Sequence, residues 1–183
     1  VGQGAMAAIL GLDYEAVAGL AAEAAAPGEV CAAANDNDPA QVVVSGSAAA
    51  VARAAELARA RGAKRALMLP VSAPFHCSLM APAARAMAEA LAGVDLLPPR
   101  VPLVANVLAH AVGEPEVIRS LLVEQVTHRV RWRESVAWMA AEGVTEFWEI
   151  GAGKALSGMI RRIAPEAATR TVGTSAEVAA ARG

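Results

Sequence analysis

The fold is decided by the stretch Asn35-Asp36-Asn37-Asp38-Pro39-Ala40-Gln41-Val42-Val43-Val44-Ser45. Asn, Asp and Pro favour turns and Val favours strands, so we expect a turn at 35–39 and a strand at 41–45. The residues before the turn, 30–34, are also typical of a strand. We therefore expect the two strands to form a hairpin-like pair.

One helix is expected before this hairpin and another after it. Asp13 can cap the first helix, which should start at Tyr14 and end before Pro27-Gly28. Ser47 can cap the second helix, which should end at Gly62. Both helices would then lie between strands along the chain.

Two short apolar runs complete this pattern. Residues 5–10 precede the first helix and residues 66–69 follow the second, and both are expected to be strands. The order becomes βαββαβ, the pattern of ferredoxin-like domains. We therefore expect an α/β chain in which residues 4–70 form a ferredoxin-like small subdomain.

From residue 71 onward, longer helices alternate with single strands. We expect a buried strand at 101–107 and further strands at 146–150 and 169–172. Strands that alternate with helices imply a parallel sheet covered on both faces. Three strands are few for such a sheet, so residues 71–183 should be the C-terminal part of a larger α/β subdomain, with its other strands upstream of Val1.

Composition excludes several classes of function. The 183 residues carry 16 Lys and Arg against 18 Asp and Glu, so the chain lacks the basic stripe of a nucleic-acid binder. Two cysteines are too few for a disulfide framework, which makes the cytoplasm the expected location. No apolar run reaches the ~18 residues of a membrane span, so we expect no membrane partner.

One histidine follows an apolar run and directly precedes a helix that is expected to start near Ser78. It lies in the segment Ser72-Ala73-Pro74-Phe75-His76-Cys77-Ser78-Leu79-Met80. A fold can present a general base in this way. A structural histidine at a helix start is the alternative. No G-x-S-x-G nucleophile elbow occurs in the chain, so this base would have no nucleophile of its own.

The other reactive residues suit structural roles better. His110 and His128 are expected at the surface, and Cys77 is expected to be a small buried thiol. Gly151-Ala152-Gly153-Lys154 could offer backbone N–H groups to a phosphate, but it lacks the spacing of known phosphate loops. We therefore favour a structural turn there, and we expect neither a cofactor nor a metal.

Several stretches, in order, resemble malonyl-CoA:acyl carrier protein transacylases. They are Gly4 to Ile9, the turn Asn35 to Val43, Ala73-Pro74-Phe75-His76-Cys77, Glu124-Gln125-Val126 before Val130-Arg131-Trp132, and Glu149-Ile150-Gly151-Ala152-Gly153-Lys154. The resemblance spans nearly the whole chain, but it corresponds only to the C-terminal portion of that family. It implies a ferredoxin-like subdomain inserted in an α/β-hydrolase-like subdomain with a parallel sheet.

This resemblance also implies roles for four residues. His76 would be the general base, held by the main-chain carbonyl of Gln125. Phe75 would form a wall of the acyl pocket that favours malonyl over branched groups, unless it is an ordinary packing residue. Asn37 would lie near the acyl group, although turn chemistry alone also explains an Asn there.

The family's serine lies in a G-H-S-x-G elbow, and that elbow, an oxyanion-hole glutamine and a malonate-binding arginine all belong to its upstream part. None has a counterpart here, so we expect the chain to begin at an internal cut. The implied function is transfer of malonyl from coenzyme A to the phosphopantetheine thiol of acyl carrier protein, through an acyl-serine, in fatty acid or polyketide synthesis. The partners would be malonyl-CoA, acyl carrier protein and the missing N-terminal part.

Two other functions are open to a chain of this kind. A ferredoxin-like module could bind RNA or a small ligand, but RNA readers of that shape stack bases on aromatic residues, and the strands expected before Pro70 have none. A non-catalytic relative could instead bind carrier protein. The full set of ordered motifs argues weakly against such a decayed enzyme.

Overall fold

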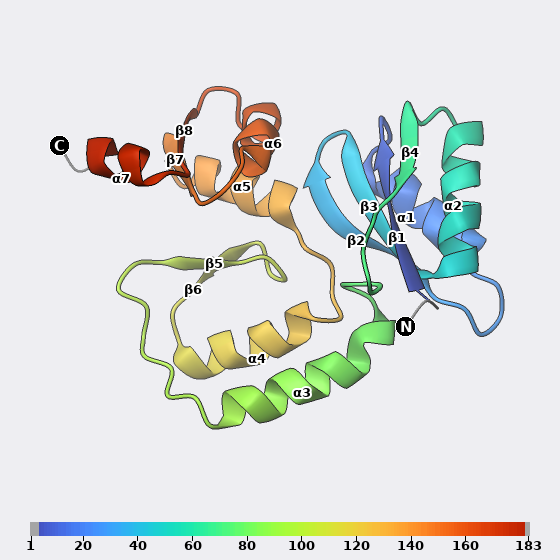
Figure 1. Ribbon diagram of the computed structural model, residues 1–183, viewed down its shortest axis with the longest axis horizontal. Helices are drawn as coiled ribbons and strands as arrows, with labels where there is room; N and C mark the ends of the chain where they lie inside the picture. Colours follow the sequence, from blue (N-terminus) through green and yellow to red (C-terminus); the bar gives the residue numbers. More distant parts are fainter. Residues whose placement is uncertain (1–3, 182–183) are drawn as a thin grey trace.

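Four antiparallel strands form the largest sheet of the computed structural model, which describes residues 4–181 (Figure 1). Their order is β2-β3-β1-β4, so strands distant in sequence pair at the centre. The expected βαββαβ order is confirmed. Its elements are β1 (Gly4–Leu10), α1 (Tyr14–Ala24), β2 (Cys31–Asp38), β3 (Gln41–Ser47), α2 (Ala48–Ala60) and β4 (Arg65–Met68).

Helices α1 and α2 cover one face of this sheet (Figure 1). Alternate residues of β3, Val42 and Val44, are fully buried among the side chains of these helices, as the two-residue period of a strand requires. Alanines fill much of this core, so the helices can approach the sheet closely. The expected cap of α1 is confirmed, because Asp13 Oδ1 accepts a hydrogen bond of 2.9 Å from the backbone N–H of Ala16.

The expected turn at 35–39 is wrong. Strand β2 continues to Asp38, and the turn consists of Pro39 and Ala40 alone. Two irregularities in the pairing with β3, on either side of 35–36, let the polar residues stay in the strand. Asp38 closes the short turn by accepting a hydrogen bond of 2.9 Å from the N–H of Ala40.

Ser47 also differs from its expected role. It is the N-cap residue of α2, but its side chain does not cap that helix. Its hydroxyl instead accepts a hydrogen bond of 3.1 Å from the N–H of Val30. The preceding Gly46 lies so close to Val30 that a Cβ atom there would meet its carbonyl oxygen at 1.9 Å. Only glycine fits this crossing of two chain segments.

The rest of the chain forms two layers beside the first sheet (Figure 1). Helices α3 and α4 lie side by side with a small antiparallel sheet, and a parallel pair of strands packs with α5 and α6. The elements are η1 (Ser78–Met80), α3 (Ala81–Ala92), β5 (Leu103–Ala105), β6 (His110–Val112), α4 (Pro115–Gln125), α5 (Trp132–Ala141), β7 (Glu146–Ile150), α6 (Ala155–Ile163), β8 (Ala168–Val172) and α7 (Ser175–Ala181).

The expected parallel sheet is present only in part. Strands β7 and β8 pair in parallel over their full length, as expected. The strand expected at 101–107 shrinks to β5 and pairs with β6 in the antiparallel sense. Val101 is 72% exposed, and Pro102 has no N–H to offer a neighbour, which explains the late start of the strand.

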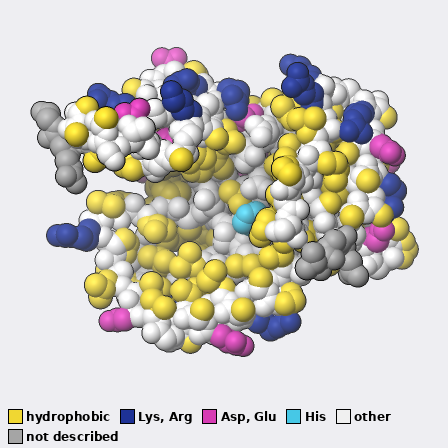
Figure 2. Space-filling view, in the orientation of Figure 1, with side chains coloured by type: hydrophobic (Ala, Val, Ile, Leu, Met, Phe, Trp, Pro, Cys, Tyr) yellow, Lys and Arg dark blue, Asp and Glu magenta, His cyan; other side chains and the backbone are white. Residues whose placement is uncertain are grey.

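Large apolar side chains remain exposed on the inner surfaces between these layers. Figure 2 shows them gathered in a hollow between the α3–α4 layer and the layer that contains β7. Two large apolar residues of these layers, Leu97 after α3 and Ile150 at the end of β7, are 77% and 76% exposed. Contiguous apolar surface of this kind marks an interaction site. No helix within residues 4–181 is long and apolar enough to span a membrane.

Candidate active site

The candidate base, His76, has an unusual backbone conformation. It lies between β4 and η1, with a φ angle of 60°. This left-handed region is rare for residues other than glycine, although histidine occurs there more often than most. Such strained residues cluster at functional sites, where the surrounding structure holds them in place.

His76 contacts the end of α4. Its Nδ1 atom lies 2.9 Å from the carbonyl oxygen of Gln125. A carbonyl oxygen only accepts hydrogen bonds, so Nδ1 carries the proton in the neutral ring and Nε2 has a free lone pair. The ring is therefore prepared to accept a proton at Nε2. The helix ends at Gln125, so this carbonyl has no N–H partner one turn further along.

The residues beside His76 differ in exposure. Phe75 is 39% exposed, which is high for a large apolar side chain. Cys77 is 2% exposed, and its thiol lies 3.2 Å from the carbonyl oxygen of Pro74, which confirms a small buried thiol. Burial and the nearby Cys77 raise the pKa of Cys31 to about 11. Cys31 is therefore not a nucleophile near neutral pH.

Asn37 lies in β2 between two buried carboxylates. Asp36 is fully buried and forms a two-pronged ion pair with Arg133 of α5, with N–O distances of 2.9 and 2.8 Å. Asp38 is 2% exposed and is paired with Arg162 of α6 at 2.6 Å. These pairs fix the edge of the first sheet to the helices beside it. Among the described residues, no hydrogen bond joins Asn37 to His76.

A backbone contact strengthens the same junction. Val130 donates to the carbonyl oxygen of Ala34 at 2.8 Å and accepts from the N–H of Asp36 at 2.9 Å. The segment before α5 thus extends the edge of β2 by a single parallel bridge with Asn35. The first sheet and the rest of the chain are joined by main-chain hydrogen bonds as well as by ion pairs.

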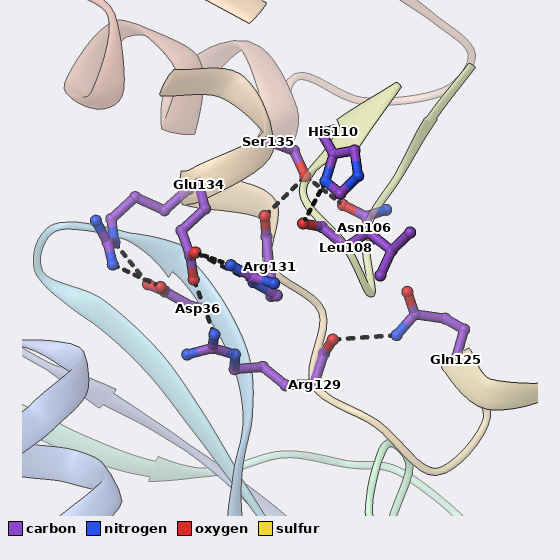
Figure 3. A network of polar contacts seen from close by, with 10 residues as sticks. Asp36, Asn106, Leu108, His110, Gln125, Arg129, Arg131, Glu134 and Ser135 are labelled. Carbon is purple, nitrogen blue, oxygen red and sulfur yellow. Dashed lines mark hydrogen bonds and ion pairs between the residues drawn. The ribbon is translucent and has the colours of Figure 1, made fainter. Parts of the chain in front are cut away.

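Glu134 is the centre of a charged network at this junction (Figure 3). Its carboxylate pairs with Arg129 at 2.9 Å and with Arg131. The hydrogen bond from Arg131, together with the charge of Arg129, lowers the pKa of Glu134 below its ordinary value of 4.5. Arg129 also stacks on the ring of Tyr14, 4.1 Å from its centre. The network ties the start of α5 to α1.

The glycine-rich turn at 151–154 is occupied by the protein itself. Glu149 accepts hydrogen bonds from the N–H groups of Leu156 (3.1 Å) and Ser157 (2.7 Å). This carboxylate takes the position that a bound phosphate would need at the start of α6. The structural interpretation of the turn is therefore supported. Residues 4–181 hold no cluster of His, Cys, Asp and Glu suited to a metal.

The remaining histidines are confirmed as surface residues. His110 and His128 are both exposed. The Nδ1 atom of each lies within hydrogen-bond distance of a carbonyl oxygen close in sequence, and Nδ1 of His128 also lies near the Thr127 hydroxyl.

An apolar cavity of about 240 Å³ lies between β5 and α4, with Leu121 and Gln125 in its wall. His76 does not line it, but Gln125 belongs both to the cavity wall and to the contact with His76.

Sequence reasoning missed the ion pairs that join the sheet to α5 and α6. One signal was present: Asp36 and Asp38 alternate along the strand, which puts both carboxylates on one face. Their partners, Arg133 and Arg162, lie 97 and 124 residues away in sequence. Nothing local identifies either arginine as a partner.

Comparison with known proteins places the chain among acyltransferases. Residues 1–175 match the family described as the acyl transferase domain. The malonyl CoA-acyl carrier protein transacylase of Escherichia coli O157:H7 is 49% identical over 162 residues, which is 88% of this chain and 52% of the relative. The chain thus spans about half the length of the curated relatives it matches.

Solved structures agree in fold. An acyl-carrier-protein-S-malonyltransferase from Bartonella henselae is 52% identical with a TM-score of 0.94, over 99% of this chain and 57% of that one. A type II PKS acyl-carrier protein in complex with its malonyl-transacylase gives 40% identity and a TM-score of 0.93, over 98% of this chain and 58% of that one. At these identities the similarity extends beyond the fold to the family.

Proposed function

We propose that this chain, which belongs to the malonyl-CoA:acyl carrier protein transacylase family of acyl transferases, supplies the catalytic histidine of a transacylase active site. The contact between His76 and the carbonyl of Gln125 carries this proposal. The nucleophile would be a serine in a G-H-S-x-G segment outside these 183 residues. The chain alone would not transfer malonyl groups.

The proposed reaction has two halves. In the first, Nε2 of His76 takes the serine proton while the serine oxygen attacks the thioester carbon of malonyl-CoA. The C–S bond then breaks, and the proton passes from His76 to the leaving thiolate. In the second half, His76 takes the proton of the carrier's phosphopantetheine thiol as its sulfur attacks the malonyl-serine, and returns that proton to the serine oxygen.

Helix α4 would assist at the moment when the imidazole becomes charged. The C-terminal end of a helix carries partial negative charge, and Gln125 is its last residue. A protonated histidine at such an end gains up to ~2 kcal/mol. The carbonyl and the helix end together would take the role that a carboxylate has in Ser-His-Asp sites.

The neighbours of His76 would set the choice of acyl group. Phe75 directly precedes the base and presents part of its ring to solvent, so it could contact a bound acyl chain. Its bulk would exclude a methyl branch next to the thioester. Asn37 lies at the edge of the first sheet that faces α5, and we propose that it approaches the acyl group in the assembled site.

The proposed division of the chain follows the sheets. Residues 4–70 would be a ferredoxin-like small subdomain, and residues 71–183 part of an α/β-hydrolase-like subdomain whose parallel sheet needs more strands than β7 and β8. The exposed Ile150 and Leu97 would be covered in the complete enzyme. The expected cytoplasmic location and the carrier protein as partner belong to the same proposal.

A fusion experiment tests the proposed function. The 183 residues are joined behind a segment of the family that carries the G-H-S-x-G serine, to give what we term the joined enzyme. We expect malonyl transfer from coenzyme A to acyl carrier protein by the joined enzyme and none by the 183 residues alone. Turnover by the 183 residues alone, or a folded but inactive joined enzyme, would contradict the proposal.

A further inference from the structure

Gln125 uses its main chain and its side chain for different contacts. Its backbone carbonyl accepts from Nδ1 of His76 at 2.9 Å. Its side-chain nitrogen Nε2 lies 2.9 Å from the carbonyl oxygen of His128 and 3.2 Å from that of Arg129 (Figure 3 shows the second). One residue thus contacts both the candidate base and the turn that follows α4.

These side-chain contacts suit a carboxamide. The NH₂ group of glutamine has two protons, and two carbonyl oxygens lie within hydrogen-bond distance of it. A glutamate would bring carboxylate oxygens against the same two carbonyls and repel them. A leucine of similar size would leave both carbonyls without this donor. Glutamine therefore suits this position by its N–H donors as well as by its size.

The turn after α4 is fixed at its far end as well. Val130 follows Arg129 directly and is bound to β2 through Ala34 and Asp36. Gln125 therefore closes a short segment, 126–129, whose other end is part of the first sheet. The ends of helices fray, and backbone hydrogen bonds from Val126 and Thr127 also hold this one, so the closed turn would add a further restraint on the Gln125 carbonyl.

We propose that the side chain of Gln125 is a positioning residue that holds its own carbonyl in line with Nδ1 of His76. It acts through the carbonyl and does not touch substrate. The inference rests on the proposed function, which makes His76 the base, and extends it from the main chain of Gln125 to its side chain. We call the two side-chain hydrogen bonds of Gln125 the clamp. Without the clamp, the carbonyl turns and the imidazole loses its fixed orientation and tautomer.

Two variants of the joined enzyme test this clamp. Gln125→Leu removes the donors at similar size, and Gln125→Glu replaces them with acceptors, while both keep the backbone carbonyl. We expect kcat to fall by about tenfold or more, with a KM for malonyl-CoA within about twofold of the parent, because orientation of a base affects the chemical step. Glu124→Gln is the matched control, since the Glu124 side chain is exposed and forms no ion pair found in residues 4–181.

A spectroscopic readout separates positioning from simple loss of fold. The ¹⁵N signals of the His76 ring report its tautomer, and we expect the Nδ1–H form to predominate in the parent and to give way to a mixture in both Gln125 variants. Unchanged kcat and unchanged ring signals in both variants would overturn the inference, while the proposed function would stand if His76→Ala abolishes transfer. If His76→Ala retains near-normal transfer, the proposed function itself fails.

Discussion

Nδ1 of His76 lies 2.9 Å from the carbonyl oxygen of Gln125, a residue 49 positions later at the end of α4. The contact joins the segment after the first sheet to the last turn of a helix in the neighbouring layer. It fixes which ring nitrogen carries the proton in the neutral imidazole. The backbone at His76, with its φ angle of 60°, is part of this arrangement.

The left-handed backbone at residue 76 should lower the free energy of unfolding by a measurable amount. Both His76→Gly and His76→Ala remove the imidazole, but only glycine adopts this φ angle without strain. We expect His76→Gly to be more stable than His76→Ala by about 1 kcal/mol in urea unfolding of the 183-residue chain. Equal stability of the two variants would mean that the backbone is not strained there.

Phe75 should control the choice of acyl group. In the joined enzyme, we expect Phe75→Ala to raise the relative kcat/KM for methylmalonyl-CoA over malonyl-CoA by about tenfold, because the ring no longer blocks a methyl branch. Competition between the two substrates measures this ratio. Leu97→Ala, which truncates an apolar residue in the segment after α3 and away from His76 in sequence, is the control. An unchanged preference in Phe75→Ala would reject the role of pocket wall.

The buried pair of Asp36 and Arg133 should be a large contributor to stability. Arg133→Ala leaves a fully buried carboxylate without its partner, so we expect the free energy of unfolding to fall by about 3 kcal/mol. The exposed pair of Arg61 and Glu23 is the control, and Arg61→Ala should cost less than about 1 kcal/mol. Similar losses of unfolding free energy in the two variants would show that the buried pair stabilises the fold no more than the exposed pair does.

Glu134 should make stability depend on pH. Arg131 and Arg129 hold its pKa below 4.5 in the folded chain, so the folded state favours the ionised carboxylate. This contribution is complete above the unfolded pKa and is lost as the pH falls through the lower, folded value. We expect Glu134→Gln to be less stable than the parent at about pH 7, and the difference to shrink below about pH 4.5. A constant difference across this range would contradict the assignment.

Much of the secondary structure follows from local signals. The strand at 146–150 has the bounds expected from sequence, and Asp13 caps α1 as its position predicts. In these cases the deciding residues are neighbours in the chain. The contact between Gln125 and His76 came from resemblance to a family, because no local pattern links residues so far apart.

The errors have a common physical cause. Asn35 to Asp38 have the composition of a turn, yet they form a strand because Arg133 and Arg162 neutralise two buried carboxylates there. Likewise, the apolar run at 101–107 became a short antiparallel strand because it pairs with β6. Long-range partners override local preference in both places.

The first turnover of the joined enzyme tests the central claim most directly. Rapid mixing with malonyl-CoA releases one equivalent of coenzyme A as the serine is acylated, before the carrier protein is involved. We predict that His76→Ala slows this first release by about 10² to 10⁴-fold, the usual contribution of a general base. A first release at nearly the parent rate would show that His76 is not the base of this site.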